Sequence, residues 1–175
     1  MCINLETSLR QNSRESYERI ADAIRKANHK IVIGLRGGRG CALQFARLLS
    51  HLTTQVDYII DEGHDQICRL TDLGEKDIAV FLNFPRYYKI DEKIAAILAQ
   101  KRIPCILITD SMASPVARYA EEVLLVETEH CGFFHSMLGV TGVLEYLLIL
   151  MCQKEPGAFR ERLKERDSVL DGYLI

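Results

Sequence analysis

The sequence predicts an α/β protein, a three-layer αβα sandwich with a five-stranded parallel sheet. Short β-branched or apolar segments, which are typical of buried strands, recur along the chain. Segments with the apolar spacing of helices separate them, and this alternation is typical of βαβ units. The chain has 175 residues, which suits one compact domain. The five strands are expected at residues 30–33, 56–60, 78–82, 103–109 and 123–126.

The helices are predicted from apolar spacing and from capping residues. Ser13 is a suitable N-cap for a helix over residues 13–28, in which Tyr17, Ile20 and Ile24 share one face. Proline at the first helical position favours a short helix after Ser114. Further helices are expected at residues 41–52, 90–100 and 134–152, and a short one from Ser114-Pro115 to about Ala120. A closing helix that includes Phe159, Leu163 and Leu170 is expected after Pro156-Gly157.

Charge and cysteine content exclude several classes of protein. The chain carries 22 basic and 24 acidic residues, so it lacks the broad positive field of a protein that holds DNA mainly through phosphates. Its six cysteines form no C-x-x-C pair, as expected for reduced thiols. No signal peptide is visible, and the longest apolar run, residues 143–151, contains Glu145 and is too short to cross a bilayer. We therefore expect a cytoplasmic protein with no membrane partner.

Cationic side chains follow the first and third predicted strands. Open α/β sheets bind ligands at the carboxyl ends of their strands, where the strand order reverses. In the flavodoxin-like order 2-1-3-4-5, that point lies between strands one and three, so the two loops would face each other and form a pocket for a small anion. The loops contain Arg36, Gly37, Gly38 and Arg39 in the first case, and Asn83, Arg86, Tyr87 and Lys89 in the second.

Each residue of the first loop has a functional and a structural interpretation. Gly37 and Gly38 would expose backbone N–H groups at the beginning of a helix, where the helix dipole favours an anion, or they would only allow a strand-to-helix turn. Arg36 and Arg39 would add positive charge to the pocket or would simply be solvated. In the second loop, Arg86 is suited to phosphate, because a guanidinium can donate two parallel hydrogen bonds.

Polar residues at the ends of the third and fourth strands face the same edge. Asn83 would bind a sugar hydroxyl or cap its loop, and Lys89 would face the pocket or belong to the solvated side of the next helix. Thr109 and Ser111 are further candidates, although Asp110 and Ser111 equally suit the cap of a turn.

Four motifs, taken in order, resemble one known family. They are IVIGLRGGR at residues 31–39, FLNFPRYYK at 81–89, ITDS with SPVA between 108 and 117, and FFHS at 133–136. The set resembles the sugar isomerase (SIS) domain and, more narrowly, the effector domain of RpiR/MurR-type transcriptional regulators. The resemblance spans residues 13–150. It implies the SIS fold at residues 29–155, preceded by a linker and opening helix at 1–28 and followed by a packed C-terminal helix at 156–175.

The resemblance implies a domain that senses a phosphorylated sugar or a related anionic metabolite as a homodimer or homotetramer. DNA would be reached only through an N-terminal helix-turn-helix domain, for which the roughly 28 residues before the first strand are too few. The family usually carries a Ser-x-Ser-Gly-x-Thr loop after the third strand. Here that loop lacks Ser, Thr and Gly and resembles the Phe-Pro-Arg-Tyr-Ser-Arg-like loop of some regulators. Anion binding would then depend on Arg86, Lys89 and Tyr87.

The family also implies a contribution to the pocket from His135 and Ser136, at the beginning of the last long helix, where polar residues equally suit an ordinary helix start. The spacing of His130, Cys131 and His135 is not that of a closed zinc site, so no metal and no cofactor are expected.

Two other functions stay open beside sensing. A phosphosugar isomerase needs a positioned base to move a proton beside a carbonyl, and Glu127, Glu129, His130 and His135 lie in the right region without a clear assignment. A domain that only dimerises is the other alternative, because the serine-rich loop is missing.

Overall fold

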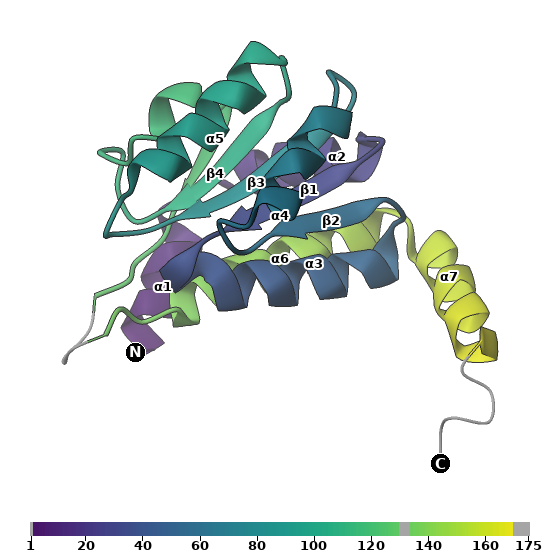
Figure 1. The fold of residues 1–175 in the computed structure, drawn as a ribbon. Coiled ribbons are helices and arrows are strands. Elements are labelled where there is room, and N and C mark those ends of the chain that lie inside the picture. The colour runs from purple at the N-terminus through teal and green to yellow at the C-terminus, as the bar shows by residue number, and fades with distance from the viewer. Residues whose placement is uncertain (1, 130–133, 170–175) are drawn as a thin grey trace.

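A five-stranded parallel sheet forms the centre of the computed structural model, which describes residues 2–129 and 134–169 (Figure 1). The strand order is β2-β1-β3-β4-β5, as predicted, so the order reverses between β1 and β3. Every residue of β1 and β3 is buried, which explains their unbroken apolar runs. The strands are β1 (Lys30–Gly34), β2 (Val56–Ile59), β3 (Ile78–Asn83), β4 (Cys105–Thr109) and β5 (Glu122–Leu125).

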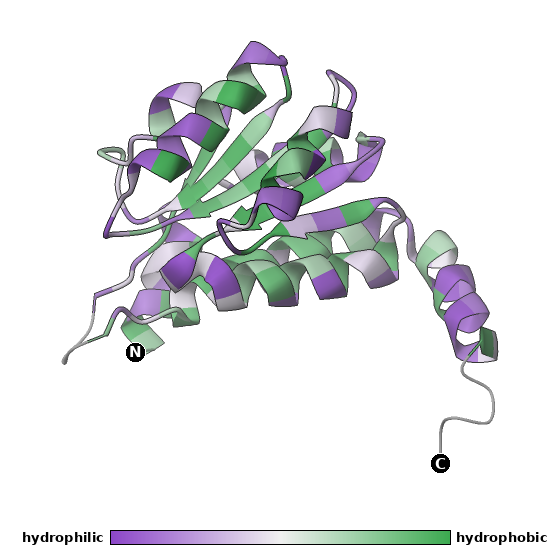
Figure 2. Cartoon of the chain, viewed as in Figure 1, coloured by the Kyte–Doolittle hydropathy of each residue, from purple (hydrophilic) through white to green (hydrophobic). Residues whose placement is uncertain are grey.

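Helices cover both faces of the sheet and complete the predicted three layers. On one face, α2, α3 and α6 bury Tyr17, Phe45 and Leu147 against the sheet, and on the other α5 buries Ile94. Figure 2 shows apolar residues along the central strands. The α-helices are α1 (Cys2–Arg10), α2 (Arg14–Lys26), α3 (Arg39–Leu52), α4 (His64–Cys68), α5 (Lys89–Gln100), α6 (Leu138–Lys154) and α7 (Pro156–Val169), with 3-10 turns η1 (Arg36–Gly38), η2 (Arg69–Asp72) and η3 (Ala117–Tyr119).

Several helix boundaries differ from those predicted. Ser13 does cap α2, because its side chain accepts a hydrogen bond from the Ser16 N–H at 3.1 Å. Ser114 Oγ accepts the Val116 N–H at 3.3 Å, as an N-cap does, but the segment that follows forms only the turn η3 and not a helix to Ala120. The last long helix was expected from residue 134 but begins at Leu138.

Two helices were missed, and some predictions cannot be compared. Helix α1 buries the polar residues Asn4 and Ser8, so hydropathy gives no signal for it, and α4 is a single short turn. His130, Cys131 and Leu170 lie outside the described residues. In the described part of the chain, none of the helices is long and apolar enough to span a membrane.

Helix α7 continues from the end of α6 and lies beside the end of α3. Phe159 is buried, and the Arg162 guanidinium donates to the Ser50 and Thr53 carbonyls, both at 2.9 Å. These bonds satisfy carbonyl groups that have no partner inside a helix at its C-terminus. Figure 1 shows the far end of α7 extending away from the sheet.

Candidate functional site

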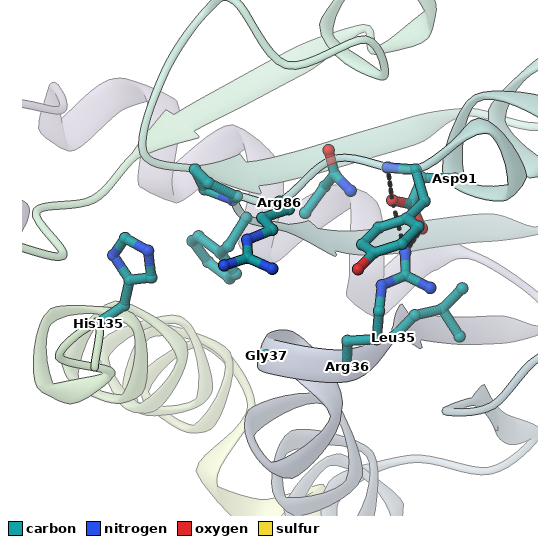
Figure 3. A pocket seen from close by; sticks show the side chains of 10 residues that line it. Leu35, Arg36, Gly37, Arg86, Asp91 and His135 are labelled. Atoms are coloured by element: carbon teal, nitrogen blue, oxygen red, sulfur yellow. Dashed lines mark hydrogen bonds and ion pairs between the residues drawn. The ribbon is translucent and has the colours of Figure 1, made fainter. Parts of the chain in front are cut away.

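A pocket of about 270 Å³ opens at the carboxyl edge of the sheet, where the strand order reverses (Figure 3). The loops after β1 and β3 form two of its sides, and the segment before α6 forms a third. The two loops therefore face each other, as the strand order requires. The lining residues are Leu35, Arg36, Gly37, Asn83, Phe84, Pro85, Arg86, Tyr88, Asp91 and His135.

The glycines of the first loop have different roles. At Gly38, a Cβ atom would lie 2.9 Å from the Leu82 carbonyl oxygen, so glycine is what lets η1 pack directly on β3. At Gly37, a Cβ atom would meet no atom within 4 Å, and this residue lines the pocket. Gly38 is thus required for packing, whereas Gly37 lies where a ligand can approach the backbone at the beginning of α3.

Arg36 is held in place by acidic side chains. Its Nη2 lies 2.7 and 2.8 Å from the two carboxylate oxygens of Asp91, and its Nη1 contacts Glu62. The guanidinium also stacks 3.8 Å from the centre of the Tyr88 ring. The Asp91 side chain is only 1% exposed and also accepts a hydrogen bond from the Tyr88 N–H at 3.0 Å. The charge of Arg36 is therefore balanced within the protein.

Arg86 differs, because it has no ion-pair or hydrogen-bond partner within residues 2–129 and 134–169. It is exposed, lines the pocket, and lies between Arg36 and His135 in Figure 3. Asn83, at the end of β3, is buried and accepts a hydrogen bond from Ser114 Oγ at 2.7 Å. Among the described residues nothing accepts from its Nδ2, so Arg86 and Asn83 together offer donors to a ligand.

Other predicted site residues lie outside the lining of this pocket. Arg39 turns toward the end of β2, where its Nε donates to the Ile60 carbonyl at 2.8 Å. Lys89 is exposed at the first position of α5, as in its solvated interpretation. Ser136 donates its backbone N–H to the Thr128 carbonyl at 3.1 Å.

The candidates around β4 form a hydrogen-bonded cluster of their own. The Tyr87 hydroxyl donates to Asp110 at 3.0 Å, and Thr109 is fully buried below them. Burial, followed by the hydrogen bond and charge of Asp110, raises the pKa of Tyr87 to about 12. Ser111 Oγ accepts from the Ala113 N–H, so it caps the turn after β4. These residues support the pocket rim and do not line the pocket.

Five lining residues were missed by the sequence interpretation. The most important is Asp91, whose signal was available: an acidic residue in the first turn of a helix that directly follows a cationic loop. The other four lie in the two loops that the sequence predicted to form the pocket, but they were not named as site residues, because the sequence does not show which loop side chains turn inward. They are Leu35, Phe84, Pro85 and Tyr88.

The fold is an α/β domain with a pocket at its strand-order reversal. The SIS domain family matches residues 23–150, so the chain belongs to the SIS domain family. The resemblance drawn from the four motifs is therefore confirmed at the level of the family. A search of curated protein sequences found no match.

Solved structures share this fold over nearly the whole chain. The sugar isomerase domain of an RpiR transcription factor from Sphaerobacter thermophilus superposes with a TM-score of 0.90 at 28% identity, over 95% of this chain and 93% of that one. The Vibrio vulnificus NanR protein, complexed with ManNAc-6P, gives 0.80 at 17% identity, over 99% and 66%. The Methanococcus jannaschii protein MJ1247, inferred to be a 3-hexulose-6-phosphate isomerase, gives 0.72 at 13%, over 94% and 91%.

Proposed function

We propose that this chain is the phosphosugar-sensing domain of an RpiR/MurR-like transcriptional regulator. The observation that carries the proposal is Arg86, which lines a pocket at the strand-order reversal and has no ion-pair or hydrogen-bond partner among the residues that the structure describes. Similarity to an RpiR sugar isomerase domain and to NanR, whose structure holds ManNAc-6P, supports it. Residues 29–155 would form the sensing domain, with 1–28 as linker and opening helix and 156–175 as a packed terminal helix. A separate N-terminal helix-turn-helix domain would contact the DNA. The regulator would act in the cytoplasm.

The pocket suggests how such a ligand would bind. Arg86 would donate two parallel hydrogen bonds to the phosphate, and Asn83 Nδ2 would donate a third bond to phosphate or sugar. Arg36 and Asp91, already paired, would form a fixed polar wall for sugar hydroxyls. The volume of about 270 Å³ is near the lower end of ligand sites, which favours a monosaccharide phosphate over a nucleotide.

The outer surface of α3 and α6 fits the proposed homodimer, from which a homotetramer would assemble through a further contact. An apolar groove of about 530 Å³ lies there, lined by Leu48, Leu148, Ile149 and Cys152 among others. Ile149 is 50% exposed on a helix that is apolar nearly all round, and such helices are normally buried on every side. Ile149→Glu should therefore give monomers in sedimentation velocity. Unchanged oligomers would place the interface elsewhere.

Thermal unfolding with paired sugars tests ligand sensing. ManNAc-6P, glucose 6-phosphate and fructose 6-phosphate would each be compared with the unphosphorylated sugar. A ligand at about a hundred times its Kd stabilises by roughly 2.7 kcal/mol, which is several degrees for a domain of this size. The shift should require the phosphate and should be lost in Arg86→Ala. The matched control is Arg160→Ala, which removes an exposed arginine on α7. No shift across the panel would favour a domain that only dimerises.

A phosphosugar isomerase is the second candidate, because His135 lines the pocket and imidazole is a common general base. Glu127 and Glu129 are not among the lining residues. Any sugar phosphate that binds would be incubated in deuterium oxide. Incorporation of deuterium beside the carbonyl, lost in His135→Gln, would establish catalysis, whereas binding without exchange would support sensing alone.

A further inference from the structure

The N-terminal helix α1 contacts the rest of the protein through buried polar groups. Ser8 Oγ accepts a hydrogen bond from the Glu127 N–H at 2.8 Å and donates to the Asn4 carbonyl at 2.6 Å. Asn4 Nδ2 donates to the Glu129 carbonyl at 2.5 Å. Both side chains are almost fully buried. Helix α1 therefore binds the segment after β5 at two points, on either side of Thr128.

Thr128 connects this segment to the pocket. It is buried, and its carbonyl accepts the Ser136 N–H at 3.1 Å. Ser136 directly follows His135, which lines the pocket opposite the first loop (Figure 3). Only two hydrogen bonds and a short stretch of backbone thus separate Ser8 from the His135 side of the pocket.

A glycine on α6 brings the same elements into close contact. At Gly139, a Cβ atom would collide with Ser8 Oγ and would lie 2.9 Å from the Glu127 carbonyl and 3.1 Å from the Asn4 carbonyl. Helix α1, the segment after β5 and the first turn of α6 therefore meet with no room for a methyl group. One turn further along, a Cβ at Gly142 would meet only Leu5, at the end of a flexible side chain.

A second anchor, at Asn12 just beyond the end of α1, joins this part of the chain to the sheet. The Asn12 side chain donates to the Leu125 carbonyl at 2.8 Å and accepts from the Leu125 N–H at 2.9 Å, so it pairs with β5 as a strand would. Buried polar networks of this kind hold one geometry, because a displaced group leaves its partner without a hydrogen bond. A shift of α1 therefore cannot leave residues 127–129 unchanged.

We propose that α1 is a positioning element for the side of the pocket that carries His135, so that the docking of α1 and the shape of the pocket are coupled. Thermodynamic coupling is reciprocal. A ligand that orders His135 strengthens the docking of α1, and a force that pulls α1 away loosens this side of the pocket. The inference rests on contacts within the chain and holds whatever the pocket binds.

NMR spectroscopy of the ligand-free full chain tests the coupling with two matched variants. Gly139→Ala places a methyl group between backbone carbonyls, whereas Gly142→Ala places one against a flexible side chain. His135 ring signals would be assigned with His135→Gln. In Gly139→Ala these signals should shift, and amide exchange at Ser136 should accelerate at least roughly ten-fold relative to amides of β3. Gly142→Ala should leave both readouts as in the wild type.

The proposal is overturned if α1 amides exchange faster in Gly139→Ala while His135 and Ser136 are unchanged. Should Gly139→Ala not fold, Ser8→Ala decides the question with the same readouts, and Ser50→Ala on α3 serves as its control. Exchange at Glu127 alone would not support coupling, because its N–H donates to Ser8 directly. A Ser8→Ala variant in which only Glu127 responds therefore also overturns the proposal.

Discussion

The loops after β1 and β3 each place an arginine at the same pocket, but the protein surrounds the two side chains differently. Arg36 in the first loop is bound to the buried Asp91 and to Glu62 and stacks on Tyr88. Arg86 in the second loop has no such partner among the described residues. Both arginines follow a strand of the sheet, but Arg36 has a structural role, whereas Arg86 is left to interact with a ligand.

The difference follows from the cost of burying charge. The Asp91 carboxylate is almost completely buried, so it requires a cation and hydrogen-bond donors, and Arg36 with the Tyr88 N–H provides them. Substitutions at the two arginines are therefore expected to affect different properties of the protein. Removing the Arg36 contacts should affect stability, and removing Arg86 should affect only binding.

The largest effect is expected for Asp91→Ala, which leaves Arg36 without its buried partner. We expect a loss of about 3 kcal/mol in the free energy of unfolding. This is the lower end of the range for removing one partner of a buried ion pair, because Arg36 is partly exposed. Urea denaturation would measure it. Glu62→Ala removes the other, exposed partner and should cost less than about 1 kcal/mol. Equal losses in the two variants would show that burial does not set the strength of these pairs.

The glycines of the first loop should give the next largest effect. Gly38→Ala places a methyl group against the Leu82 carbonyl and should destabilise the protein by about 2 kcal/mol. Gly37→Ala meets open space and should cause no loss. Thermal unfolding of the two variants side by side is the measurement. A similar loss at Gly37 would mean that its backbone, and not the packing at Gly38, determines the loop.

Tyr87 in the second loop tests whether that loop also has a structural anchor. Because its pKa is raised to about 12, the hydrogen bond to Asp110 contributes fully below the ordinary pKa near 10 and is lost as pH rises toward 12. Tyr87→Phe should cost about 1 kcal/mol at neutral pH. The stability difference between wild type and variant should shrink between these pH values. A constant difference would assign the effect to packing alone.

The smallest effect is expected for Arg86→Ala without ligand. An exposed side chain with no partner should change the free energy of unfolding by no more than about 0.5 kcal/mol. Urea denaturation of this variant beside Arg160→Ala would show it. A loss above about 1 kcal/mol would mean that Arg86, like Arg36, belongs to the fold.

Helices α1 and α2 show where sequence interpretation succeeds and where it ends. Helix α2 was predicted, because Ser13 caps it and Tyr17, Ile20 and Ile24 share its buried face. Helix α1 was missed, because its buried residues Asn4 and Ser8 are polar. Their partners after β5 lie more than a hundred positions away in the chain, and Asn4 and Glu129 are 125 positions apart. No local pattern carries that pairing.

The candidate site shows the same division. The sequence placed Arg36 and Arg86 on loops that meet, since parallel strands present their carboxyl ends at one edge. It did not show that Tyr87 and Arg39 turn away from the pocket, because side-chain direction in a loop depends on nearby acceptors such as Asp110 and the Ile60 carbonyl.

The sequence alone determined the strands, the main helices and the edge of the sheet at which the pocket opens, because these follow from apolar periodicity and from the alternation of strand and helix. Tertiary structure decided which cation is available. Arg36 meets Asp91, 55 residues away in the chain, and is neutralised, whereas Arg86 meets no acid in the described residues. Such pairings depend on distances created only when the sheet forms.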